Sequence, residues 1–184
     1  PAGLVGNWQS EMQKLFSLNF KVVSGADANK GNPFAGEDSD LVIVSVDSLR
    51  GPKLFKWLGD ETTLPYDLVV FDEAHKLSAR QEPDFRFVKT DRYQLAEALA
   101  GVPDRSDRWK LHWSATHLLL LTATPHMGND YPYYALWRLL DPTQLTTIEA
   151  FTAFPREARE AHFIRRTKEE MVKLDGTPLY PGRK

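Results

Sequence analysis

The 184-residue sequence contains no cysteine, and this absence removes several classes of site at once. A chain without cysteine can form no disulfide framework, no thiolate zinc site and no cysteine nucleophile. Its apolar runs are all shorter than the roughly 18 residues that a membrane-spanning helix needs, and its first residues lack a signal-peptide pattern. We therefore expect a chain that has no membrane partner and works in a reducing cytoplasm.

The sequence also lacks an excess of basic charge. It has 23 Lys and Arg residues against 25 Asp and Glu residues, so its formal net charge is −2. Because a domain that binds nucleic acid usually carries a basic patch or a basic balance, any such contact here must be local. The length suits one globular domain that is large enough to bury a core.

A third absence concerns phosphate binding. The sequence contains no Gly-x-x-x-x-Gly-Lys-Ser/Thr, the loop whose backbone amides and lysine neutralise nucleotide phosphates. The segment 25–31 has glycines and a lysine, but it lacks the Gly-Lys-Ser/Thr ending, and Asn32-Pro33 follows where a phosphate-binding helix would begin. We interpret 25–31 as a solvated loop.

Four apolar segments predict the strands of an α/β fold with a mostly parallel sheet. They are residues 20–23, 41–46, 68–71 and 117–122. Residues 68–71 and 117–122 carry no polar alternation, which is typical of strands that are buried on both faces. Apolar periodicity predicts helices near 4–16, 53–57, 91–99 and 130–140. The polar segment 78–89 predicts a mobile loop, and 101–115 predicts irregular structure.

Acidic residues follow one of these strands directly. Asp72-Glu73-Ala74-His75 begins where strand 68–71 ends, and open α/β sheets bind their ligands beyond the carboxyl ends of such strands. Asp72 could hold the water shell of a magnesium ion that rides on nucleotide phosphates. Glu73 could orient an attacking water as a general base. The alternative is ordinary loop chemistry in which His75 is a hydrogen-bonded structural residue.

A hydroxyl-rich turn, Thr122-Ala123-Thr124-Pro125, follows the strand at 117–122. Taken alone, it fits a core strand closed by a proline turn equally well. Together, the two segments are far more specific. Asp72-Glu73-Ala74-His75 resembles motif II, the DEAH motif, and Thr122–Pro125 resembles motif III of the superfamily 2 helicases and translocases.

The resemblance is nearer to the Swi/Snf-related branch of that superfamily. Residues 136–142 and 163–171 are similar to it, and within it to bacterial members akin to the RNA-polymerase-recycling translocase. The resemblance implies a RecA-like P-loop NTPase lobe whose phosphate-loop strand is missing at the amino end. It divides the chain into a partial ATP-binding lobe, 1–145, and exit helices with a linker toward a second lobe, 146–184.

What the resemblance implies about chemistry is ATP hydrolysis with Mg²⁺, coupled to movement along double-stranded DNA. Asp72 would serve the metal, Glu73 the attacking water, and His75, Thr122 and Thr124 would sense the γ-phosphate and couple it to the other lobe. The strand at 41–46 is similar to motif Ib, whose hydroxyl residue contacts the nucleic-acid backbone, and Ser45 holds that place. A serine satisfied within its own strand is an equally good interpretation.

Two weaker patterns complete the sequence. Pro1, Leu4, Trp8 and Glu11 match motif Ia, and we interpret Trp8 as a core-packing residue. A loose basic cluster at Arg105, Arg108 and Lys110 could meet phosphate, although a solvated loop is favoured.

The resulting hypothesis is a motor fragment that is inactive in isolation. Its partners would be double-stranded DNA, the second RecA-like lobe of the same parent chain, and RNA polymerase or a phage-defence complex. The alternative is a non-catalytic docking module for nucleic acid or RNA polymerase, derived from a helicase lobe. Without a phosphate-loop strand beside it, strand 117–122 should also present an unpaired apolar edge.

Overall fold

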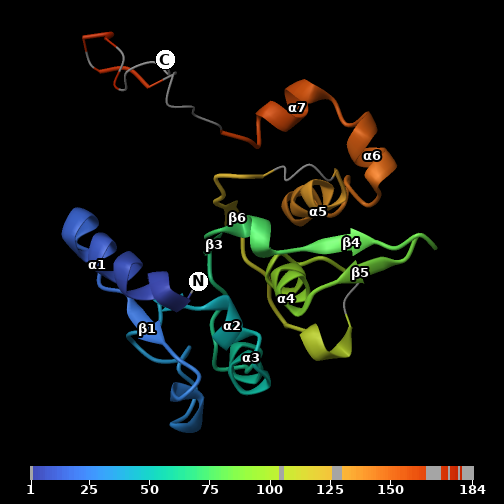
Figure 1. The fold of residues 1–184 in the computed structure, drawn as a ribbon. Helices are drawn as coiled ribbons and strands as arrows, with labels where there is room; N and C mark the ends of the chain where they lie inside the picture. Colours follow the sequence, from blue (N-terminus) through green and yellow to red (C-terminus); the bar gives the residue numbers. More distant parts are fainter. Residues whose placement is uncertain are drawn as a thin grey trace.

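A computed structural model describes residues 2–103, 106–125, 130–164, 171–173, 175–177 and 179 (Figure 1). In chain order, with η for a 3₁₀ turn, the elements are η1 (Ala2–Leu4), α1 (Val5–Phe16), β1 (Lys21–Val23), η2 (Asp27–Asn29), β2 (Val42–Val44), α2 (Val46–Leu49), α3 (Pro52–Leu58), β3 (Leu68–Phe71), η3 (Ala74–Lys76), β4 (Ala79–Gln81), β5 (Phe87–Lys89), α4 (Asp91–Leu99), η4 (Asp107–Trp109), β6 (His117–Leu120), α5 (Asp130–Leu140), α6 (Ile148–Ala153) and α7 (Arg156–Glu160). The fold is a mixed α/β arrangement with short parallel sheets, which confirms the predicted class. None of the helices in the described residues is long and apolar enough to cross a membrane.

Strand pairing confirms the parallel prediction in part. β1 pairs with β2 in parallel, and β3 pairs with β6 in parallel with Leu68 opposite His117 and Phe71 opposite Leu120. The described strands form separate two-stranded sheets rather than one continuous sheet. The parallel pair β3–β6 lies at the centre of the molecule, with α1 on one side and α5 on the other (Figure 1).

The prediction of a mobile loop over 78–89 was wrong, because β4 and β5 form an antiparallel hairpin there. Aromatic packing anchors the hairpin: the ring of Phe87 lies 5.7 Å from that of Tyr93 and 5.4 Å from that of Tyr131, both edge-on. The contact with Tyr131 joins segments far apart in the chain, so the polar sequence around Phe87 gave no periodic signal of it.

The core forms mainly between α3, α4, β3 and the segment before β6. Leu54, Leu95 and Leu99 are buried there, and so are Trp109 and Trp113. The indole N–H of Trp113 donates to the backbone oxygen of Leu58 at 3.1 Å. The segment 101–115, predicted to be irregular, therefore supplies two of the large core side chains. An indole ring can pack into a core without regular secondary structure around it.

Burial of the central strands differs from the prediction. Val69 and Phe71 face the core with their partners on β6, but Leu68 is 53% exposed, Val70 is 42% exposed and Leu119 is 45% exposed. Because side chains alternate across a strand, the exposed residues share one face of the β3–β6 pair. These strands are thus buried on one face only in the described structure, and the expectation of burial on both faces was wrong.

We expect this exposed apolar face, together with the free side of β6, to make the 184-residue chain self-associate. Val70 and Leu119 lie opposite each other in the register, so the double substitution Val70→Thr with Leu119→Thr replaces the paired apolar side chains of this face with polar, β-branched residues that suit a strand. Sedimentation velocity over a range of concentrations should show the double variant shifted toward monomer. Leu64→Thr is the matched control, because Leu64 is 74% exposed outside the strands. If the unsubstituted 184-residue chain stays monomeric at every concentration, the expectation is contradicted.

One ion network is buried inside the fold. Glu97 of α4 is 1% exposed; its Oε1 lies 3.0 Å from Nζ of Lys89 and also pairs with the guanidinium of Arg138 on α5. The hydroxyl of Tyr93 donates to the backbone oxygen of Ala135 at 2.8 Å. Burial, with a further contribution from Glu97, raises the pKa of Tyr93. The network ties β5, α4 and α5 together.

Helix α5 carries a second apolar cluster on its other side. Phe151 of α6 packs among Tyr133, Tyr134 and Trp137, with ring centroids 5.7 to 5.9 Å apart. The same helix also contacts η3 and β4. α5 therefore connects the carboxyl-terminal helices to the turn that follows β3. Pro1 and residues 165–170 of the segment 163–171 lie outside the described residues.

Candidate functional site

The candidate site lies at the carboxyl end of the β3–β6 pair. Because the two strands are parallel, residues 72–75 and 121–125 leave the same edge of the sheet. Two backbone hydrogen bonds continue the pairing past the strands: the N–H of Leu121 donates to the oxygen of Phe71, and the N–H of Ala74 donates to the oxygen of Leu121, both at 2.8 Å. The acidic segment and the hydroxyl-rich turn are thus fixed against each other.

Glu73 adopts a left-handed backbone conformation, with φ 53° and ψ 45°. This conformation is uncommon for a residue with a Cβ and costs on the order of 1 kcal/mol. It ends the strand direction abruptly and starts the 3₁₀ turn η3, which carries His75. As a result Oε2 of Glu73 lies 3.2 Å from Nδ1 of His75. The strained backbone therefore brings these two side chains together.

His75 also contacts the turn after β6. Its Nδ1 lies 3.1 Å from Oγ1 of Thr122, and that same oxygen accepts a hydrogen bond from the backbone N–H of Thr124 at 3.1 Å. A proton on Nδ1 would be donated toward Glu73, and an unprotonated Nδ1 would accept from the Thr122 hydroxyl. Nδ1 of His75 therefore lies within hydrogen-bonding distance of both Glu73 and Thr122 and bonds one of them in each state. Contacts of this kind connect Glu73, His75, Thr122 and the backbone of Thr124. The side chain of Thr124 is itself exposed.

Asp72 is held by two hydrogen bonds, one on each carboxylate oxygen. Its Oδ1 accepts from the backbone N–H of Glu73 at 2.9 Å, and its Oδ2 accepts from the indole N–H of Trp8 at 3.0 Å. Trp8 belongs to α1, so this contact fixes α1 to the end of β3 across 64 residues of sequence. The interpretation of Trp8 as a core-packing residue was wrong, because its half-buried ring belongs to neither described apolar cluster and its N–H instead orients Asp72. The sequence signal for this hydrogen bond was an indole N–H donor in a helix that matches motif Ia.

The single carboxylate of Asp72 fits a magnesium ion that is shared with phosphates and water better than a metal ion whose ligands are all protein side chains. Within the described residues, no group of three His, Cys, Asp or Glu side chains could hold a metal ion. Magnesium is usually bound through one or two carboxylates, with phosphate oxygens and water completing its shell. Each Asp72 oxygen accepts one protein hydrogen bond and keeps a further lone pair. A single oriented carboxylate at a strand end is what this mode of binding needs.

Ser45 lies apart from this network, at the amino end of α2. It is 8% exposed, and its Oγ accepts from the backbone N–H of Ser48 at 3.0 Å and donates to Oγ of Ser48 at 2.8 Å. Ser45 is therefore the N-cap of α2. The structure brings Asp72, Glu73, His75 and Thr122 together, and it places Ser45 on a neighbouring element.

Comparison with curated proteins places the chain near an RNA polymerase-associated protein. No protein-family model matches the sequence. RNA polymerase-associated protein RapA of Serratia proteamaculans (strain 568) is 34% identical to the chain over 164 residues, which cover 86% of this chain and 15% of that protein. The chain therefore spans only a small part of the length of this curated relative. The identity over most of the chain supports a relationship to the Swi/Snf-type, helicase-related family.

Proposed function

We propose that this chain forms part of an ATP-dependent DNA translocase or helicase-like motor, and that residues 72–75 and 122–124 are its ATP-hydrolysing edge. In this proposal residues 1–145 are a partial RecA-like lobe and residues 146–184 lead toward a second lobe. The observation that carries the proposal is the chain of polar contacts from Glu73 through His75 and Thr122 to the backbone of Thr124. These contacts would let the Glu73 carboxylate and the turn after β6 respond to the same bound nucleotide.

The proposed roles follow from where each group stands. Asp72, oriented by Trp8 and by the backbone of Glu73, would hold magnesium through its water shell. When bound, Mg²⁺ would neutralise charge on the nucleotide phosphates. Glu73 would orient the attacking water and accept its proton at Oε2. His75, in contact with Oε2, would report the state of Glu73 to Thr122, and Thr124 would follow through its backbone N–H.

The proposed partners rest on the relative and on the neighbouring elements. The name of the RapA relative makes RNA polymerase a partner to test. Double-stranded DNA is the proposed track, with a second RecA-like lobe of the same parent chain completing the motor in the cytoplasm. Ser45 would contact the nucleic-acid backbone from α2. In the present structure the hydroxyl donates to Oγ of Ser48, so a hydrogen bond from Ser45 to a phosphate oxygen would require the hydroxyl to rotate away from Ser48.

We expect residues 1–184 alone to hydrolyse ATP at a negligible rate, with or without duplex DNA. The sequence has no Gly-x-x-x-x-Gly-Lys-Ser/Thr, and removing the groups that stabilise developing phosphate charge costs orders of magnitude in rate. A coupled phosphate-release assay with saturating Mg²⁺ and ATP checks this expectation. Turnover at the roughly 1–100 s⁻¹ typical of phosphoryl-transfer enzymes would mean that the missing loop is not required.

A docking module without catalysis is the second candidate. Residues 1–184 contain no phosphate loop, and such a module would not need one. The coding sequence immediately upstream of Pro1 separates the two. A Gly-Lys-Thr or Gly-Lys-Ser within one strand and turn of Pro1 supports the motor, and a start codon at that point supports the docking module.

A further inference from the structure

A pocket outside the candidate site is lined by four basic side chains. It lies between the end of α2, helix α3 and the 3₁₀ turn η4, and has a volume of about 300 Å³. Its walls include Arg50, Lys56, Arg108 and Lys110 over the rings of Phe55 and Trp109, and none of the described residues that line it is acidic. The positive charge of the lining is partly balanced, because Asp47, Asp91 and Asp107 form ion pairs with Arg50, Arg108 and Lys110 from outside the lining.

The pocket brings together residues that the sequence keeps apart. Arg108 and Lys110 belong to the basic cluster recognised in the sequence, whose third member, Arg105, lies outside the described residues. Arg50 and Lys56 come from a segment about fifty residues earlier. The fold, rather than the local sequence, makes the site.

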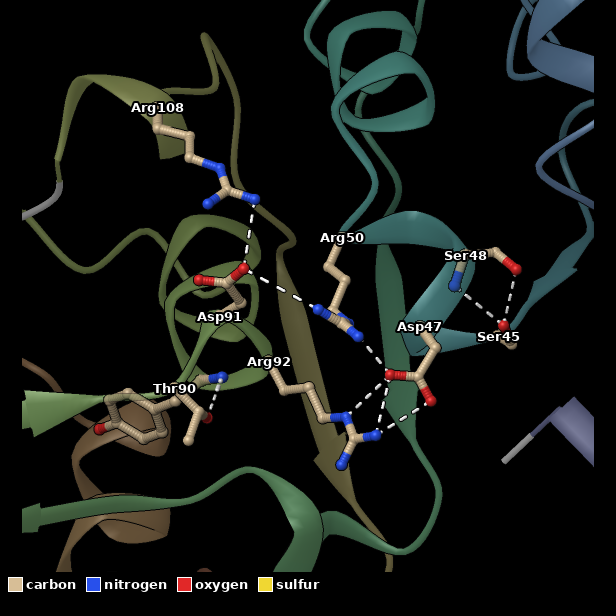
Figure 2. A network of polar contacts seen from close by, with 9 residues as sticks. Ser45, Asp47, Ser48, Arg50, Thr90, Asp91, Arg92 and Arg108 are labelled. Carbon is tan, nitrogen blue, oxygen red and sulfur yellow. Dashed lines mark hydrogen bonds and ion pairs between the residues drawn. The ribbon is translucent and has the colours of Figure 1, made fainter.

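Ion pairs behind the pocket hold its arginines in place (Figure 2). Oδ2 of Asp91 lies 3.2 Å from Nη2 of Arg108 and 3.9 Å from Nη1 of Arg50, so one carboxylate links both walls. Asp47 pairs with Arg50 at 3.0 Å and with Arg92 at 2.8 Å. Hydrogen bonds from Arg92 and then Arg50 lower the pKa of Asp47.

Aromatic contacts fix the floor of the pocket. The guanidinium carbon of Arg108 lies 4.7 Å from the centre of the Trp109 ring, and the rings of Phe55 and Trp109 meet edge-on with centroids 4.8 Å apart. The side chains of Arg50, Arg108 and Lys110 remain 41%, 54% and 67% exposed. Preorganised cations that are still open to solvent are suited to binding a polyanion, since little side-chain order must be gained on binding.

We propose that this basic pocket binds the phosphodiester backbone of a nucleic-acid duplex. The proposal rests on the proposed function, because it extends the predicted contact at Ser45. Ser45 and Arg50 flank the four residues of α2, which is about 6 Å long at 1.5 Å per residue. A strand that rises about 3.4 Å per phosphate could therefore reach both. Arginine and lysine from three elements match a row of phosphates, which position a protein on a duplex without reading its sequence.

The test measures the affinity of the chain for a short fluorescent DNA duplex. Fluorescence anisotropy monitors binding in the absence of nucleotide at salt concentrations from about 50 to 200 mM. The triple variant Lys56→Gln, Arg108→Gln and Lys110→Gln should weaken binding by at least about tenfold at the lower salt. It should reduce the slope of log K against log salt by about 2.7, since each phosphate contact contributes about 0.9. An RNA duplex of equal length shows whether the backbone alone suffices, and binding of either duplex with this loss supports the proposal.

The matched control removes the same charge elsewhere. Lys30, Arg80 and Arg86 are 77%, 70% and 76% exposed and do not line the pocket, so their triple replacement by Gln should change binding less than about twofold. The double variant Lys56→Gln with Lys110→Gln leaves the Arg108 stack intact and should lower the slope by about 1.8. Thermal unfolding followed by circular dichroism confirms that each variant is folded.

Three outcomes would overturn the proposal: no binding of either duplex by the parent chain, equal losses in the pocket and control variants, or tighter pocket-dependent binding of a fluorescent polyglutamate peptide. The last would identify the pocket as a surface for acidic protein segments. Because the assay contains no nucleotide, none of these results bears on the ATP hydrolysis test, and the two proposals can fail separately.

Discussion

Replacement of Glu97 by alanine is expected to lower the free energy of unfolding by about 3–5 kcal/mol, because it leaves Arg138 as a buried cation without its carboxylate. Glu97 is 1% exposed and contacts both Arg138 and Lys89. A loss of this size is a large share of the roughly 5–15 kcal/mol that stabilises a typical domain. Urea unfolding followed by tryptophan fluorescence measures it.

Two further variants identify the mechanism of that loss. Glu82→Ala breaks the ion pair with Arg80, whose side chain is 70% exposed, and exposed pairs contribute only about 0–1 kcal/mol. Replacing Glu97 and Arg138 together by methionine removes both charges and should recover much of the stability. Similar losses for Glu82→Ala and Glu97→Ala would show that burial does not set the cost.

The sequence predicted the parts of this fold that depend on local patterns. Strand 68–71, the strand predicted at 117–122 and observed over 117–120, and helix α5 follow from short apolar segments. The placement of Asp72 and the turn at Thr122 at one edge follows from the residues directly after the strands. Parallel pairing then follows from the rule that such strands are joined by helical crossovers. These features need no knowledge of the rest of the chain.

What the sequence did not predict depends on contacts between distant segments. The β4–β5 hairpin is held by Phe87 against Tyr93 and Tyr131, and such packing has no periodic signature in a polar segment. The prediction that β3 and β6 are buried on both faces failed for a related reason. An apolar residue such as Leu119 predicts a strand but not whether anything covers its outer face, so the exposed face of β3–β6 was missed.

The candidate site likewise combines features that local sequence predicts with features that depend on distant segments. Motif spacing placed Asp72, Glu73 and Thr122 at one edge of the sheet, but the indole N–H of Trp8 on Asp72 depends on how α1 docks. The basic pocket is a stronger case, since Arg50 and Arg108 are linked by ion pairs to Asp91, a third segment of the chain. Long-range ion pairs of this kind are not readable from one sequence.

Glu73→Gln is expected to reduce ATP turnover by about 10²–10⁴-fold in a protein that does hydrolyse ATP, produced from the complete coding sequence. The amide keeps the size of the side chain but cannot accept a proton from the attacking water. Nucleotide affinity should change little, because Asp72 keeps its own hydrogen bonds from Trp8 and the Glu73 backbone. Steady-state hydrolysis and a fluorescent-nucleotide titration separate the two effects.

Thr122→Val distinguishes a catalytic role for Glu73 from a merely structural role of its network. Valine is similar in size to threonine but removes the oxygen that lies 3.1 Å from His75 and accepts the N–H of Thr124. If Glu73 handles the water and Thr122 transmits its state, Thr122→Val should lower the stimulation of hydrolysis by DNA more than the basal rate. Glu82→Gln, on the β4–β5 hairpin, should affect neither quantity. Equal losses of basal hydrolysis in Glu73→Gln and Thr122→Val would mean that the network only holds the turn in place, and Glu73 would then have no separate part in activating water.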